Sequence, residues 1–113
     1  MAEDSARGKP LTEPVLWILL SLSSEPRHGY ALMRDVETMS GSRVRLSTGT
    51  LYGALRRLLE DAWIEPFEQP DTSRDKQAYR LTAIGRSHMK RELERLTHLT
   101  QAARARLKTR RAQ

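Results

Sequence analysis

Four arginines and no acidic residue lie in the stretch RVRLSTGTLYGALRR, residues 43–57. Arginine guanidinium groups bind phosphates and the edge of guanine, and short hydroxyl groups donate hydrogen bonds to phosphate oxygens. The side chains that combine these two chemistries are Ser47, Thr48, Thr50, Arg56 and Arg57. The stretch therefore predicts a surface that binds a polyanion.

Residues for catalysis or metal binding do not form a recognisable pattern. The chain has no cysteine, which excludes thiol nucleophiles, thiolate zinc sites and disulfides. The three histidines have no serine or aspartate partner at a known spacing. His88 and His98 would lie about 15 Å apart along a helix, too far to share a metal. We therefore expect no enzyme, no metal site and no cofactor.

Length and charge set the class of protein. With 113 residues the chain can bury one small core. The net charge is +6, and residues 83–113 hold nine basic residues against Glu92 and Glu94, a balance of +7, so residues 1–82 carry −1. The C-terminal excess suits either a solvated helix face or an acidic partner. The apolar run VLWILLSL is shorter than the roughly 20 residues of a membrane span, and its flanks lack signal-peptide features, so we expect a cytoplasmic protein.

A helix must carry the basic stretch. Ser47 or Thr48 is a candidate N-cap, and Leu51, Leu55 and Leu58 recur at helical spacing as one apolar stripe. The opposite face, at 100° per residue, holds Gly49, Gly53, Arg56, Arg57 and Glu60, with Thr50 and Tyr52 at its two margins. Glycine costs roughly 1 kcal/mol against alanine in a helix interior. On this outer face the glycines leave no cavity and give a duplex close access to the helix backbone.

Two helices are predicted before this one. Thr12 and Pro14 mark the start of a helix over residues 13–23, which is apolar on nearly every face and should be buried on more than one side. A second helix begins at Gly29 and ends near Gly41, a natural C-terminal stop.

Two strands and a long helix are predicted after it. The segments IEPFEQP and KQAYRLT form a hairpin that must lean on the helices. Thr82 is an N-cap for a helix over residues 83–108, with a frayed basic tail to 113. Its apolar seam has heptad spacing and comprises Met89, Leu93, Leu96, Thr100, Ala103 and Leu107.

The seam needs a partner, because a helix of this length extends about 37 Å and outruns a small core. It either folds back over the first helix or pairs with a second copy of the chain. Pairing is favoured, since an isologous dimer would also cover the first helix and Trp17.

This order of elements predicts a mainly α fold with a small β-hairpin. Residues 1–10 would be a disordered arm, residues 11–82 a winged helix-turn-helix domain and residues 83–113 a C-terminal dimerisation helix. In such a domain the third helix enters the major groove and the hairpin lies along the adjacent backbone.

Three segments in this order also resemble the PadR family of bacterial transcriptional regulators: HGYALMRDVE, LSTGTLYGALRRLLEDAWIE and YRLTAIGRSHM. The resemblance covers residues 11 to about 95, and the short length resembles the subclass with a single C-terminal helix. It implies a homodimeric winged-helix repressor with crossing C-terminal helices and a nearby small-molecule effector site. The chain departs from the family at Gly53, where proline is common, and at KQA, where a basic and aromatic run is usual.

The resemblance implies DNA contacts from three places: the start of the second helix, the recognition helix and the wing. The residues at these places are Tyr30, Ser47, Thr48, Thr50, Tyr52, Arg56, Arg74 and Lys76, and Arg57 joins them on the same helix face. Alternatives remain for some residues. Tyr52 lies between core and solvent and could pack instead, and Arg57 could pair with Asp61. His28 fits a local capping role better than a DNA contact.

Trp17 and Trp63 either line a flat aromatic effector pocket at the dimer interface or belong to the core. The predicted function is a sequence-specific DNA-binding transcriptional regulator that acts as a repressor on double-stranded DNA. The alternative is a winged-helix interaction module that binds an acidic protein partner.

Overall fold

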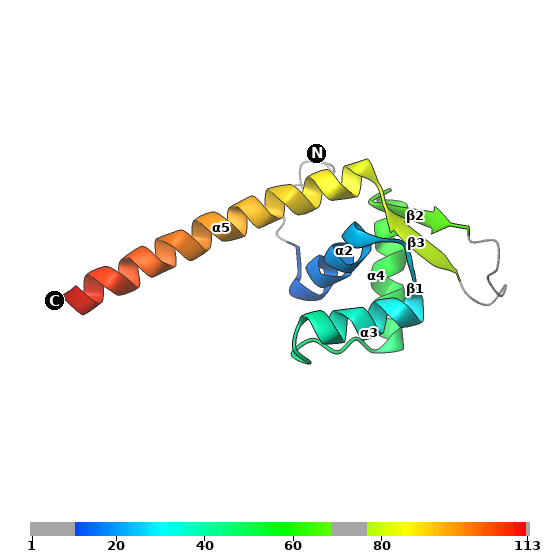
Figure 1. Ribbon diagram of the computed structural model, residues 1–113. Coiled ribbons are helices and arrows are strands. Elements are labelled where there is room, and N and C mark those ends of the chain that lie inside the picture. The colour runs from blue at the N-terminus through cyan, green and yellow to red at the C-terminus, as the bar shows by residue number, and fades with distance from the viewer. Residues whose placement is uncertain (1–10, 69–76, 113) are drawn as a thin grey trace.

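A helical body carries a small sheet and one protruding helix (Figure 1). The computed structural model describes residues 11–68 and 77–112, with side chains described to residue 109. The helix α5 leads away from the body, and the molecule extends 62 × 37 × 23 Å. The elements are, in order, α2 (Glu13–Ser24), β1 (Arg27–His28), α3 (Gly29–Met39), α4 (Thr48–Glu60), β2 (Ile64–Phe67), β3 (Ala78–Leu81) and α5 (Ala83–Ala112). The predicted fold class is confirmed.

The predicted helix boundaries are also confirmed at most positions. Thr12, Ser47 and Thr82 each accept a hydrogen bond from the backbone N–H three residues on, at 3.4, 3.1 and 3.0 Å. After α3, Gly41 adopts a φ of +64°, the left-handed conformation that suits glycine. Helix α5 continues to Ala112, beyond the predicted end at residue 108.

Within the described residues the sheet has three antiparallel strands, and not only the two of the predicted hairpin. Its order is β1-β3-β2, with Arg27 opposite Tyr79 and His28 opposite Ala78. The sequence predicts only a turn before α3, because a strand of two residues has no alternation to detect. Since β1 leads directly into α3, this pairing fixes the start of α3 to the hairpin of β2 and β3, which is the wing. The predicted arm, residues 1–10, and the wing residues Arg74 and Lys76 lie outside the described residues.

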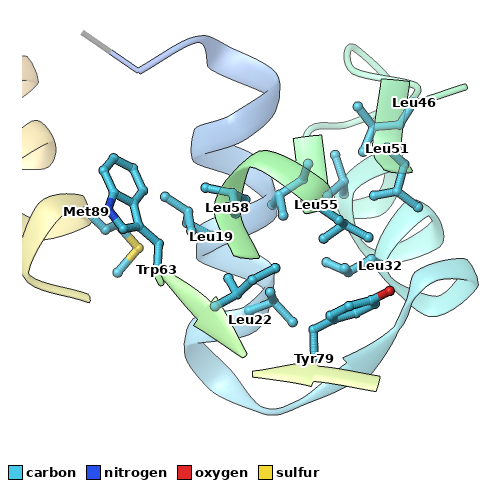
Figure 2. Packing of buried hydrophobic residues seen from close by; sticks show 13 residues of the cluster. Leu19, Leu22, Leu32, Leu46, Leu51, Leu55, Leu58, Trp63, Tyr79 and Met89 are labelled. Carbon is cyan, nitrogen blue, oxygen red and sulfur yellow. The ribbon is translucent and has the colours of Figure 1, made fainter. Parts of the chain in front are cut away.

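Helix α2 lies at the centre of the packing. It contacts α3, α5 and β3, which confirms the prediction of burial on more than one side. Figure 2 shows the leucines of α4 pointing into the same cluster. Burial of one leucine side chain contributes about 1.5–3 kcal/mol. The core cluster comprises Ile18, Leu19, Leu22, Leu32, Val36, Leu46, Leu51, Leu55, Leu58, Trp63, Ile64, Tyr79 and Met89.

Helix α5 starts directly on the turn that leaves α4. The Thr82 backbone N–H donates to the Trp63 carbonyl at 3.0 Å, and the Thr82 hydroxyl donates to the Ala62 carbonyl at 2.7 Å. A Cβ on Gly85 would collide with the Trp63 carbonyl oxygen and lie 2.9 Å from the Leu81 Cδ1. The first turn of α5 therefore reaches this position only because residue 85 has no side chain.

Candidate nucleic-acid interface

Helix α4 has one buried face and one open face. Leu51, Leu55 and Leu58 are buried in the core. At Gly49 and Gly53, an added Cβ would meet no atom of the described residues within 4 Å, so both glycines face open space. The predicted outward position of the glycines is confirmed, and the backbone of α4 is accessible along this face.

The N-terminus of α4 is held by Ser47. Its hydroxyl oxygen accepts from the Thr50 backbone N–H, and the hydroxyl donates to Thr50 Oγ1 at 3.0 Å. The Ser47 side chain is thus engaged within the helix, while the Thr50 hydroxyl keeps its own proton for a partner outside. Thr48 is exposed beside it.

Replacement of Ser47 by alanine should lower the free energy of unfolding by about 1 kcal/mol, because the first turn loses its cap. Thermal unfolding followed by circular dichroism would measure the loss. Thr48→Ala is the matched control, since the described residues include no hydrogen bond from the Thr48 side chain and its loss should be near zero. Equal losses in the two variants would contradict the capping role of Ser47.

Arg56 and Arg57 add positive charge to the open face. Both side chains are exposed, and neither forms an ion pair within the part of the chain that the structure describes. The alternative pair of Arg57 with Asp61 is therefore not formed. By contrast, Arg45 approaches Glu37 at 3.5 Å. The charge on Arg56 and Arg57 remains available to an anion.

Tyr52 extends the site toward the start of α3. Its side chain is 45% exposed, yet its ring packs on Gly29, where a Cβ would lie 2.9 Å from the Tyr52 Cζ. Both alternatives for Tyr52 thus retain support, because one part of the ring is packed and another is exposed. Residues four apart share a helix edge, so Thr48 and Arg56 lie on the same edge of α4 as Tyr52. Of these three residues, Tyr52 is the one that contacts the beginning of α3.

Tyr30 is exposed beside that contact. It follows Gly29, is 69% exposed, and has the Arg34 guanidinium 5.8 Å from its ring centroid. A guanidinium over a tyrosine ring at this distance is a cation–π contact. Arg34 was not among the residues predicted from the sequence, although its spacing of four residues from Tyr30 on a helix was a usable signal. Arg34 adds a cationic group beside Tyr30 at the exposed start of α3.

The remaining predicted site residues have other surroundings. Trp63 is 8% exposed and stacks on His88 with ring centroids 4.4 Å apart and an interplanar angle of 17°, which places Trp63 in the core. Trp17 is half-buried, and its indole N–H donates to Glu13 at 3.1 Å. His28 occupies the N-cap position of α3, but its side chain makes no capping hydrogen bond.

The predicted seam of α5 divides into two parts. Met89 belongs to the core, and Leu93 packs against it, so the proximal part folds back onto the body of the chain. Leu96 is half-buried but outside the core cluster. The distal part is uncovered, with Leu107 64% exposed and Thr100 and Ala103 also exposed. Packing of α5 on its own chain, the first of the two alternatives for the seam, therefore accounts only for the proximal half of the seam.

A model of the transcriptional regulator PadR-like family matches residues 18–91. The chain belongs to this family. The PadR-like match begins within α2 and ends in the first third of α5, and so includes the whole of α4 with its open face. The members of this family are transcriptional regulators and not enzymes.

The chain is also similar to part of a longer protein. An uncharacterised 37.1 kDa protein in transposon TN4556 of Streptomyces fradiae is 36% identical over 83 residues, which cover 74% of this chain and 23% of that protein. The chain thus spans about a quarter of the length of this relative.

Solved structures share the PadR-like fold. A PadR family transcription regulator from Clostridium difficile has a TM-score of 0.69 at 20% identity, covering 82% of this chain and 96% of that one. RosR of H. salinarum has a TM-score of 0.64 at 27% identity and covers 88% of both chains. None of the helices in the described residues is both long and apolar enough to cross a membrane.

Proposed function

We propose that this chain is a homodimeric repressor that binds double-stranded DNA through the open face of α4. The observation that carries the proposal is the combination on this face of two glycines in open space with two arginines that have no ion-pair partner in the described residues. A solvated helix face has no need of glycine, which costs roughly 1 kcal/mol against alanine in a helix interior. A helix face that must come close to a DNA duplex does need glycine, because glycine leaves the helix backbone accessible.

The elements around α4 fit docking in the major groove. Thr48 and Thr50 at its N-terminus would donate to phosphate or base edges, and the first-turn N–H groups favour an anion. Arg56 and Arg57 lie further along the helix and would reach phosphates or guanine. Tyr30 at the start of α3 would contact the backbone. The wing residues Arg74 and Lys76 complete the proposed set.

Dimerisation is proposed from the uncovered distal half of α5. A second copy would cover Leu96, Thr100, Ala103 and Leu107, and an isologous pair of domains would bind two half-sites about 34 Å apart or a multiple of that. We also propose that a flat aromatic effector binds near Trp17, because the Trp17 indole is only half-buried. At Trp63 an effector would have to displace the stacked His88.

Arg56→Ala should weaken DNA binding about tenfold, because a good arginine contact to a base or phosphate contributes about 1–3 kcal/mol. The probe is a labelled duplex covering the DNA immediately upstream of the gene, in a mobility-shift assay over a salt series. Affinity of the unaltered protein should fall steeply with salt, because bound phosphates release counterions. If Arg56 neutralises one phosphate, its removal should also make the salt slope shallower by about 0.9.

The matched control is Arg91→Ala, which removes the same charge from an exposed position on α5. Its affinity and salt slope should stay those of the unaltered protein. Equal losses in both variants would mean that only net charge matters. Failure of the unaltered protein to retard any upstream duplex would overturn the proposal and favour the module that binds an acidic protein.

A further inference from the structure

Three elements meet at the side chain of Tyr52. Its ring, which projects from α4, packs on Gly29, the first residue of α3. Tyr79 of β3 lies in the same region. Burial raises the pKa of Tyr79, and the charge interaction with the Tyr52 hydroxyl raises it further. Tyr52 thus touches the helix before the recognition helix and lies near the wing, while 45% of its surface stays exposed.

The contact leaves no room for a side chain at residue 29. A Cβ there would lie 2.9 Å from the Tyr52 Cζ and closer still to the hydroxyl oxygen. Gly29 cannot easily retreat, because His28 before it pairs with Ala78 in the sheet. Nor can α4 move away, since Leu51 and Leu55 on either side of Tyr52 are buried. With both helices held in place, a methyl group at residue 29 is accommodated only if the Tyr52 ring shifts from its seat.

We propose that Tyr52 is a positioning residue whose ring, seated on Gly29, sets the spacing between α3 and α4 that DNA binding requires. The inference rests on the proposed function. Tyr30 follows Gly29 on α3, and Arg56 lies one turn beyond Tyr52 on the same edge of α4. The Tyr52 contact fixes these two side chains relative to one another. Phosphates along a duplex have a set spacing, so contacts from two helices reach them together only when the helices keep one separation.

The test uses Gly29→Ala, which adds one methyl group at a buried site and removes no atom that could touch DNA. In the natural background it should lower Tm by at least about 4 °C, as an overpacked site does. It should also weaken binding of the upstream duplex about tenfold, the loss that corresponds to about 1.4 kcal/mol. In a Tyr52→Ala background the same change should raise Tm, because alanine then replaces glycine without a clash.

Tyr52→Phe separates positioning from direct contact. It keeps the ring on Gly29 and removes only the hydroxyl, so it should bind the upstream duplex about fivefold or more tightly than Tyr52→Ala does, a difference of about 1 kcal/mol. Tyr52→Ala should lose about as much affinity as Gly29→Ala. If Gly29→Ala does not fold, these two variants decide the question alone.

Three results would overturn the inference. Tyr52→Phe that binds as weakly as Tyr52→Ala would make the hydroxyl a DNA contact. Gly29→Ala that leaves affinity unchanged, or that lowers Tm equally in the Tyr52→Ala background, would remove the link between the two residues. If the natural protein retards no upstream duplex, both the proposed function and this inference fail. The results for Tyr52→Phe and Gly29→Ala would overturn only the inference and leave the proposed function standing.

Discussion

Gly85→Ala should lower the free energy of unfolding by about 3 kcal/mol, the upper end of the usual range for an overpacked site. The added Cβ would collide with the Trp63 carbonyl oxygen. That atom belongs to the backbone and accepts a hydrogen bond from Thr82, so it cannot rotate aside. The first turn of α5 would have to lift from the turn after α4, weakening both Thr82 hydrogen bonds.

Thermal unfolding would measure the effect as a fall in Tm of about 12 °C or more. Gly53→Ala is the matched control, because the same chemical change there meets open space. It should raise stability by about 0.5–1 kcal/mol through helix propensity. A gain in Tm for both glycine variants would show that α5 does not depend on close approach at residue 85.

Leu96→Glu should dissociate the proposed dimer. Leu96 lies outside the core cluster of its own chain, so the change leaves the fold of one chain intact. In a dimer it would bury two carboxylates without partners. At about 3 kcal/mol for an unpaired buried charge, the dissociation constant should rise about a hundredfold or more. Binding to two half-sites should disappear with it.

Sedimentation velocity at micromolar concentration would measure the mass. Ala105→Glu is the control, since it introduces the same charge nine residues away, on the opposite face of α5 at 100° per residue. It should leave the mass at two chains. A mass of one chain for the unaltered protein, or a dimer that survives Leu96→Glu, would contradict pairing through this seam.

Helix α4 was predictable because its signals are local. The stripe of Leu51, Leu55 and Leu58 and the cap at Ser47 all lie within one stretch of chain, and each has the predicted position. The same holds for Thr12 and Thr82. Such signals depend on helical spacing and capping chemistry, which do not require knowledge of the rest of the fold.

Contacts between distant residues were not predictable in the same way. Strand β1 exists only because Arg27 and His28 pair with residues some fifty positions later. The packing of Tyr52 on Gly29 depends on how α3 and α4 cross. The heptad seam of α5 was visible, but its spacing does not say which partner covers each part, and the body of the chain covers Met89 and Leu93.

Helix α5 projects far beyond its attachment at Gly85, so a small rotation at this junction produces a large displacement at the far end of the helix. The helix has 30 residues, and it packs on the core as far as Leu93. The projecting part, residues 94–112, is about 28 Å long at 1.5 Å per residue, so a tilt of about 10° moves its far end by about 5 Å. The base rests on the carbonyl groups of Ala62 and Trp63, in the turn after α4, and the Trp63 ring stacks on His88. In the proposed dimer, joined through the distal half of α5, a small rotation at this junction would change the distance between the two α4 helices. The spacing of operator half-sites that the protein accepts would then depend on a contact far from the DNA.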